Sequence, residues 1–262
     1  MILVNMSEKF LIHLLGKTGT GKSSTGNTIL GIKKFPCKSS TSAVTRVIQA
    51  EAGYLGPREV MVVDGPGLVD LNSGVNQSTM DAIKHLIEET KSNVQVFLMI
   101  WRYGDPFSPD DDAMLDAMRR TFGPSVFRNC GIILMTCGDN FRADTEDTDV
   151  TFNSWCKSQT GTFSKLLREC QGRVVLMENS RSITNRDQDA LESLAAQIDS
   201  LDPKLATGES LLKDRLAIPT GVIKKCFFFA LALLVIVLTW IFIDYAPSQE
   251  ADARRAAHDV TK

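Results

Sequence analysis

The stretch Gly16-Lys17-Thr18-Gly19-Thr20-Gly21-Lys22-Ser23 matches the pattern G-x-x-x-x-G-K-[ST] at every fixed position. An apolar run at residues 10–15 precedes it as a candidate buried strand, and residues 24–30 follow as a candidate helix. Glycines let successive backbone N–H groups point inward as a nest for anions, and the helix N-terminus adds partial positive charge. The stretch therefore predicts a loop that binds nucleotide phosphates. Lys22 would reach the β- and γ-phosphates, and the Ser23 hydroxyl would bind Mg²⁺.

A second motif follows the apolar strand predicted at residues 59–63. This strand ends at Asp64, and Gly67 follows three residues later to complete D-x-x-G. A carboxylate at this place binds Mg²⁺, usually through water, in nucleoside triphosphatases. The backbone N–H of Gly67 would sense a γ-phosphate and tie the next loop to the nucleotide state. A plain turn is the alternative for an isolated D-x-x-G, but its position after a phosphate loop favours the nucleotide site.

Two further polar signals follow predicted strands and concern the base of the nucleotide. The sequence Thr136-Cys137-Gly138-Asp139 follows the apolar run 130–135, and Asn179 follows the run 173–177. The Asp139 carboxylate could accept hydrogen bonds from N1–H and the 2-amino group of guanine, a donor pair that adenine lacks. Cys137 stands where the usual motif N/T-K-x-D has lysine, so an acidic residue that caps a helix is the alternative for Asp139. An ordinary turn asparagine is the alternative for Asn179.

The alternation of apolar strands with helical segments predicts an α/β fold with a mostly parallel sheet and helices on both faces. Polar signals at several strand ends agree with this, because ligands of such sheets bind at the carboxyl ends of the strands. Residues 68–78 are polar and rich in Gly and Asn, which predicts a mobile segment. The expected strands are 10–15, 44–52, 59–63, 94–101, 130–135 and 173–177. The expected helices are 24–30, 79–90, 109–122 and 190–201, and residues 147–170 are expected to be helical with a break at 160–162.

Composition limits the remaining classes of function. The 262 residues carry a net charge of −2, so the bulk charge gives no support for binding to nucleic acid. The six cysteines form no C-x-x-C pair and have no neighbouring His cluster, which disfavours a zinc site and a disulfide framework. The first nine residues lack the features of a signal peptide. A reduced, cytosolic domain is the expectation.

The C-terminal part has a different character. Residues 226–243 contain no charged side chain, and Lys224 and Lys225 precede them. A run of this length is just sufficient to cross a bilayer, and the two lysines predict a cytoplasmic near side. We expect a GTPase-type domain at 1–201, a linker at 202–221, a transmembrane tail anchor at 222–243 and a short polar tail at 244–262. The protein would then lie on the cytosolic face of an intracellular membrane; a buried core helix is the alternative.

Four segments together resemble the immunity-associated nucleotide-binding GTPases, the GIMAP family. Residues 16–31 read GKTGTGKSSTGNTILG, and residues 64–68 read DGPGL where the family has D-T-P-G-[LF]. Residues 96–123 are similar to the family's conserved box, an apolar strand followed by an acidic turn and a helix that ends in F-G. Residues 166–173, followed by Asn179, are similar to the approach to its last guanine motif. The resemblance covers about residues 9–200.

The resemblance implies a Ras-like P-loop GTPase that binds GTP or GDP with Mg²⁺ and forms a homodimer or larger oligomer in the GTP state. It implies Mg²⁺ binding by Ser23, Asp64 and a switch threonine, either Thr45 or Thr41. Leu68 stands at the place of the water-orienting glutamine, which predicts slow hydrolysis. The arginine of the family's box is absent here, and Arg102 is a candidate substitute. The predicted nucleotide contacts are Gly16, Lys17, Thr18, Gly19, Thr20, Gly21, Lys22, Ser23, Ser24, Gly67, Thr136, Asp139 and Asn179.

Two other functions remain open at this point. A GTP-dependent membrane scaffold would bind the nucleotide and hardly hydrolyse it. A P-loop protein that uses ATP is left open by Cys137, although Asp139 argues for guanine.

Overall fold

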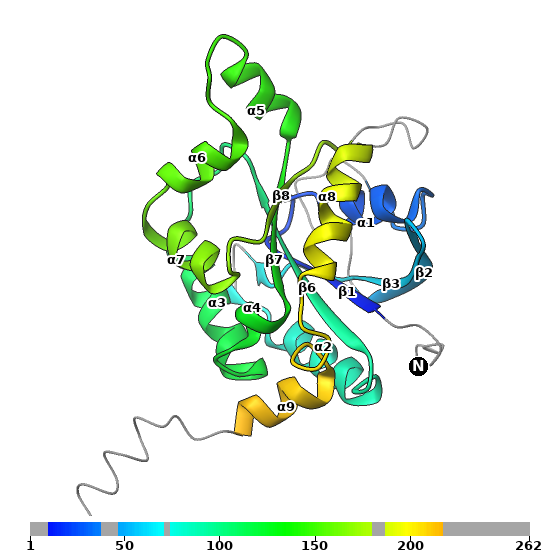
Figure 1. The fold of residues 1–262 in the computed structure, drawn as a ribbon. Helices are drawn as coiled ribbons and strands as arrows, with labels where there is room; N and C mark the ends of the chain where they lie inside the picture. The colour runs from blue at the N-terminus through cyan, green and yellow to red at the C-terminus, as the bar shows by residue number, and fades with distance from the viewer. Residues whose placement is uncertain (1–9, 38–46, 71–73, 180–186, 217–262) are drawn as a thin grey trace, which may run out of the picture. The chain divides into compact units, whose positions relative to one another are not determined.

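The computed structural model describes residues 10–37, 47–70, 74–179 and 187–216 (Figure 1). In these residues the main sheet has the strand order β2-β3-β1-β6-β7-β8. Only β2 runs antiparallel to its neighbour β3, and the other paired strands are parallel. The strands are β1 (Phe10–Leu15), β2 (Gln49–Leu55), β3 (Arg58–Asp64), β6 (Val94–Arg102), β7 (Gly131–Thr136) and β8 (Val174–Leu176).

The central strands are buried almost continuously, as expected for parallel strands covered on both faces. In the register of β1 and β6, His13 lies opposite Phe97 and Leu15 opposite Met99. Because side chains alternate along a strand, His13 and Leu14 point to opposite faces. The parallel arrangement brings the loops that follow β1, β3, β6 and β7 to one edge of the sheet, where the predicted site residues lie.

Helices cover both faces of the sheet. Helix α1 (Lys22–Leu30) packs on β1, β2 and β3, on the face of Leu14, and α8 (Gln188–Asp199) packs on β8. The opposite face, that of Phe97, is covered by α2 (Gln77–Glu89) and α3 (Pro109–Phe122), where Phe122 contacts Phe97. Helices α4 (Val126–Cys130) and α7 (Gly161–Glu169) continue this layer, whereas α5 (Gly138–Thr145) and α6 (Phe152–Ser158) extend beyond the end of β7 (Figure 1).

Helix α3 shows how local sequence sets the bounds of an element. Ser108 is its N-cap, and Ser108 with Asp111 forms a capping box. Pro109 occupies the first helical position, where its missing N–H costs nothing. Acidic residues fill the first turn, basic residues fill the last, and Gly123 ends the helix. The predicted helix at 109–122 is therefore confirmed at both ends.

The structure adds detail to the expected local structure in three places. The segment 68–78, expected to be mobile, contains the short strands β4 (Val69–Asp70) and β5 (Gly74–Val75), and Asn76 caps α2. The helical stretch 147–170 is divided into α6 and α7, which confirms the break expected near residues 160–162. Helices α4 and α5 were not predicted. The burial of Phe127 and Phe141 by tertiary contacts stabilises these short helices, and such contacts leave little periodic signal in the sequence.

In the first part of the linker predicted at 202–221, the structure contains a helix. Residues Gly208–Leu216 form helix α9, and Ala206 and Leu211 are buried. The carbonyl oxygen of Ala206 accepts from the Gln95 N–H at 2.8 Å, so this part of the chain is hydrogen-bonded to the first residues of β6. The expected transmembrane segment 222–243 lies outside the described residues. Among the helices that the structure does describe, none has the length and apolar character needed to cross a membrane.

Candidate nucleotide-binding site

Residues 16–21 form the turn between β1 and α1, and Lys22 and Ser23 begin α1, as the motif predicts. Gly16 has a φ of +147°, and a side chain there would collide with the carbonyl oxygen of Ile100 on β6. Gly21 is the N-cap of α1 with a left-handed φ of +97°. Glycine tolerates both conditions, which explains its presence at the two ends of the loop. The loop therefore places backbone N–H groups at the N-terminus of α1, where an anion is favoured.

The motif lysine is held inside the loop. Lys22 is only 7% exposed, and its Nζ donates to the main-chain oxygen of Lys17 at 2.7 Å. Burial lowers the pKa of Lys22 to about 8, and the negative charge of Asp64 partly opposes this shift. An ammonium group that has lost most of its water is suited to bind a phosphate, because the phosphate supplies the charge that the site lacks.

Ser23 and Asp64 form the predicted Mg²⁺ pair. The Ser23 hydroxyl donates to Asp64 Oδ2 at 2.6 Å, and Asp64 is fully buried at the end of β3. Two hard oxygen donors this close fit Mg²⁺, which keeps its remaining positions for water and phosphate oxygens. No cluster of three or more His, Cys, Asp and Glu side chains able to hold a metal occurs among the described residues.

The loop after β3 lies against the phosphate loop. The N–H of Leu68 donates to the carbonyl oxygen of Gly16 at 3.1 Å. A side chain at Gly67 would come within 2.8 Å of the backbone nitrogen of Thr18, so only glycine allows this approach. Leu68 itself is 1% exposed. Its side chain belongs to the core, and it cannot act on a water molecule beside the phosphates.

The predicted base-reading segments meet beside the same loop. The Thr136 hydroxyl donates to the carbonyl oxygen of Thr20 at 2.9 Å, so Thr136 braces the phosphate loop from β7. The Gly138 N–H donates to the carbonyl oxygen of Met177, which joins the loop after β7 to the end of β8. Asp139 is exposed in the first turn of α5. These contacts place Asp139 at the same edge of the sheet as the phosphate loop.

Asn179 is anchored to α1. Its Nδ2 donates to Thr25 Oγ1 and its Oδ1 accepts from Thr28 Oγ1, each at 3.0 Å. A side chain at Gly21 would lie 3.4 Å from Asn179 Nδ2, so Asn179 also lies against the phosphate loop. In this position Asn179 ties the end of β8 to α1.

The structure places the other predicted residues as follows. Arg102 is exposed at the end of β6, in register with Thr136. Thr18 and Gly19 are exposed at the tip of the phosphate loop, and Ser24 is half-buried in the first turn of α1. Both candidate switch threonines, Thr45 and Thr41, lie outside the described residues.

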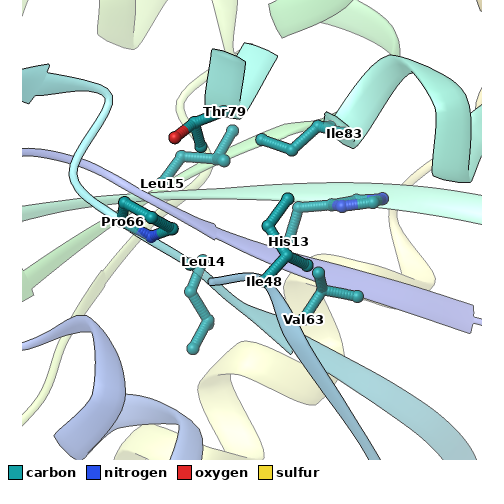
Figure 2. A pocket seen from close by; sticks show the side chains of 9 residues that line it. His13, Leu14, Leu15, Ile48, Val63, Pro66, Thr79 and Ile83 are labelled. Atoms are coloured by element: carbon teal, nitrogen blue, oxygen red, sulfur yellow. The ribbon is translucent and has the colours of Figure 1, made fainter. Parts of the chain in front are cut away.

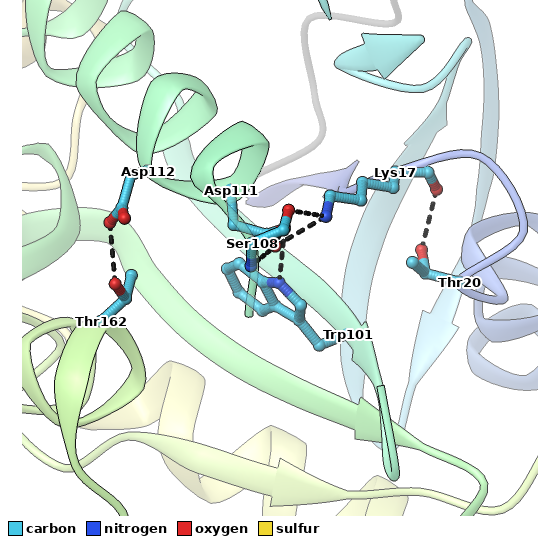
Figure 3. Close-up of polar contacts among 7 residues, drawn as sticks. All are labelled: Lys17, Thr20, Trp101, Ser108, Asp111, Asp112 and Thr162. Carbon is cyan, nitrogen blue, oxygen red and sulfur yellow. Dashed lines mark hydrogen bonds and ion pairs between the residues drawn. The ribbon is translucent and has the colours of Figure 1, made fainter. Parts of the chain in front are cut away.

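A contact that the sequence analysis did not foresee involves Lys17. Its side chain points to α3 and forms an ion pair with Asp111, with Nζ 2.6 Å from Oδ2 (Figure 3). The capping pattern of Ser108 and Asp111 predicts the role of Asp111 in starting α3. No local pattern predicts that the same carboxylate also reaches the phosphate loop.

A small pocket lies behind the loop that follows β3. His13 and Val63 line it from the sheet, Pro66 from the loop, and Thr79 and Ile83 from α2 (Figure 2). The remaining lining residues are Leu14, Leu15, Ile48 and Gly65. The pocket lies between the sheet and the elements that follow Asp64.

His13 is a fully buried, uncharged member of this region. Gln95 Nε2 donates to the carbonyl oxygens of Thr90 and Asn93, so Gln95 Oε1 is left to accept from His13 Nε2 at 2.7 Å. His13 Nδ1 has no hydrogen-bond partner among the residues that the structure describes. Burial lowers the pKa of His13 to about 4, and the bond to Gln95 opposes this only in part. His13 is therefore a neutral structural residue.

Fold and site together define a P-loop nucleotide-binding protein with a Ras-like α/β core. The strand order, the glycine-bounded phosphate loop with its buried Lys22, and the pair of Ser23 and Asp64 all belong to this class. The chain is a member of the AIG1 family, whose model matches residues 11–215. The family resemblance identified from the motifs is thereby confirmed.

The chain is similar to curated proteins of plants and mammals. It is 27% identical over 191 residues to Immune-associated nucleotide-binding protein 10 of Arabidopsis thaliana, which covers 72% of this chain and 40% of that protein. It is 28% identical over 191 residues to GTPase IMAP family member 8 of Rattus norvegicus, which covers 71% of this chain and 26% of that protein. This chain thus matches less than half of the length of these two relatives.

Solved structures share the fold. Toc33 from Arabidopsis thaliana in complex with GDP and Mg²⁺ matches with a TM-score of 0.52 and 19% identity, over 76% of this chain and 86% of that chain. A structure from work on dimerization and the GTPase activity of the chloroplast translocon components atToc33 and psToc159 matches with a TM-score of 0.51 and 20% identity, over 73% and 81% of the two chains. At this identity the likeness shows a common fold.

Proposed function

We propose that this protein is a guanine-nucleotide-binding switch that binds GTP and GDP with Mg²⁺ and hydrolyses GTP slowly. The observation that carries the proposal is the junction of β1 and α1, where the buried ammonium of Lys22 lies close to the Ser23–Asp64 pair. Phosphate and Mg²⁺ are the ligands that satisfy these groups together. The rat relative named as a GTPase and the Toc33 complex with GDP and Mg²⁺ support the same assignment.

Guanine is the base we assign, through Asp139. This carboxylate is exposed beside the phosphate loop and accepts hydrogen bonds without donating any. We expect Asp139→Asn to weaken GDP binding by about 100-fold, because the asparagine amide cannot accept from both guanine donors. The same variant should gain affinity for XDP, since xanthine has a carbonyl oxygen at position 2 to which the amide can donate.

The measurement is a titration of both proteins with fluorescent GDP, XDP and ADP. Asp147→Asn is the matched control, because Asp147 is exposed just beyond α5. Unchanged GDP affinity in Asp139→Asn would remove the base-reading role. Tight ADP binding by the parent protein would favour the ATP-using alternative.

Slow hydrolysis is proposed because Leu68 fills the position of the water-orienting glutamine and is buried. Dimerisation in the GTP state would supply a catalytic side chain that a single copy lacks at Leu68. The work on atToc33 and psToc159 connects dimerisation with GTPase activity in those proteins. Arg102, exposed at the edge of the sheet that carries the site, is our candidate for a group that acts across such a dimer.

We expect the protein to be monomeric with GDP and dimeric or larger with a non-hydrolysable GTP analogue. Light scattering after size exclusion measures this mass. Single-turnover hydrolysis should accelerate with protein concentration and lose that acceleration in Arg102→Ala. A rate that stays at the uncatalysed background even at high protein concentration would favour the non-hydrolysing scaffold.

We also propose that residues 222–243 anchor the protein in a membrane and leave the nucleotide-binding domain on the cytosolic face. The support is the uncharged run at 226–243, which is preceded by Lys224 and Lys225. A chain that ends at Lys225 should lose its association with membranes and keep its GDP affinity. Fractionation of cells and a GDP titration measure the two properties. Loss of GDP binding would mean that this segment belongs to the domain core.

A further inference from the structure

Asp111 is a fully buried carboxylate at the start of α3, outside the predicted nucleotide contacts. Its Oδ2 accepts from the Ser108 N–H at 2.8 Å and from Ser108 Oγ at 3.0 Å, and its Oδ1 accepts from Trp101 Nε1 at 3.1 Å. These donors come from β6 and from the turn before α3. They cap the helix and fix the orientation of the carboxylate.

The fourth donor comes from a distant part of the chain. Lys17 Nζ lies 2.6 Å from Asp111 Oδ2 and 2.7 Å from Ser108 Oγ, although Lys17 and Asp111 are 94 residues apart in the sequence (Figure 3). The capping box is complete without Lys17, so helix α3 does not need this contact in order to begin. The side chain of Asp111 is 1% exposed and that of Lys17 26%, so solvent screens this ion pair less than a surface pair.

The other end of Lys17 is part of the site. The main-chain oxygen of Lys17 accepts from Lys22 Nζ at 2.7 Å and from Thr20 Oγ1 at 3.0 Å. A continuous series of contacts therefore runs from Asp111 through Lys17 to Lys22. If the Lys17 side chain is held at α3, the carbonyl group that orients Lys22 has less freedom to rotate.

We infer that Asp111 is a positioning residue of the phosphate loop, which it holds through Lys17 in the conformation that binds nucleotide. The inference rests on the proposed function, because it concerns the same nucleotide site. Holding the loop in place before binding reduces the entropy that the loop loses when phosphate arrives. The main effect is therefore on nucleotide affinity.

Neighbouring contacts hold the residues around the Asp111 carboxylate in place. Trp101, which donates to Asp111, stacks on Phe107 with 4.9 Å between the ring centroids. On the next residue of α3, Asp112 accepts from Thr162 Oγ1 at 2.8 Å and joins α3 to α7. Asp112 is exposed and has no role in the series that leads to Lys22, so it offers a matched control in the same helical turn.

The test compares Asp111→Asn, Lys17→Met and the double variant in the full-length protein. The affinity and dissociation rate of fluorescent GDP are measured, together with the melting temperature of the nucleotide-free protein. We expect each single variant to bind GDP about tenfold more weakly, and the double variant to be no weaker than the weaker single variant, because both remove one coupled contact. Lys17→Arg should retain affinity when Asp111 is present and lose it in Asp111→Asn.

Lys17→Met leaves the capping box intact, so it tests the inference even if Asp111→Asn does not fold. A purely structural role would lower the melting temperatures and leave the GDP affinity of the folded protein unchanged, and this result would overturn the inference. Additive losses in the double variant would overturn it as well. Asp112→Asn should bind GDP like the parent protein.

The parent protein is first titrated with GDP, GTP and ATP, and the variants are compared with the nucleotide that it binds. Binding of ATP alone would refute the guanine assignment, while the comparison of variants would still decide the role of Asp111. A parent that binds none of the three would refute both proposals. Guanine binding by the parent with equal affinity in all variants would refute only the inference.

Discussion

Lys22→Ala is expected to reduce the affinity for GDP and GTP by about 100-fold or more, since charge-assisted hydrogen bonds to phosphate are lost. The nucleotide-free variant should fold at least as stably as the parent protein. Burial lowers the pKa of Lys22 to about 8, which means that the charged ammonium group is less stable at this place than in water. The Lys22 ammonium group is costly to bury without a phosphate. Lys22→Ala should therefore weaken nucleotide binding without destabilising the nucleotide-free domain.

Two measurements check this prediction. A titration with fluorescent GDP gives the affinity, and urea unfolding without nucleotide gives the stability of the empty domain. Lys33→Ala is the control, because Lys33 is exposed just after the C-terminal end of α1, whereas the phosphate loop lies at the N-terminal end of this helix. An unchanged GDP affinity in Lys22→Ala would refute the assignment of residues 16–23 as the phosphate loop.

The second large effect is a loss of stability at acidic pH that depends on His13. The pKa of His13 is about 4 in the folded chain, against about 6.5 in an unfolded chain. Between these two pH values the unfolded state binds more protons than the folded state. The contribution of His13 to the free energy of unfolding is therefore fully present above pH 6.5 and is lost as the pH decreases towards 4. Over this pH range His13 contributes roughly 3 kcal/mol to the free energy of unfolding, because each pKa unit corresponds to about 1.4 kcal/mol.

Urea unfolding of the nucleotide-free protein near neutral pH and at about pH 4.5 measures this effect. His13→Asn cannot take up a proton in this range, so its loss of stability between the two conditions should be smaller by roughly 2–3 kcal/mol. His85→Asn is the control, because His85 is exposed on α2. Equal losses in His13→Asn and the parent protein would show that His13 does not titrate on unfolding.

Local sequence was sufficient for much of the fold. Apolar runs predicted the main strands, since strands buried on both faces are apolar throughout. The bounds of α3 followed from Ser108, Pro109 and Gly123, whose effects act within one helical turn. The phosphate loop was predicted in the same way, because eight consecutive residues contain the whole signal. The short helices α4 and α5 escaped prediction because their stability comes from packing against the rest of the domain.

Only the folded chain shows which polar groups meet. The motif assigned Lys17 to the phosphates, but its side chain pairs with Asp111 across 94 residues of sequence. Thr136 and Asn179 were expected to contact the nucleotide, and their side chains also brace the phosphate loop and α1.

Helix α9 gives the same lesson for a whole element, since its place against α2 and α3 depends on the burial of Leu211 on an apolar surface. The physical reason is the range of the interactions. Backbone conformation and apolar periodicity are set within a few residues, so the pattern of one segment reveals them. The partner of a charged or hydrogen-bonding side chain is set by the order in which distant strands join the sheet, and that order is a property of the whole tertiary structure.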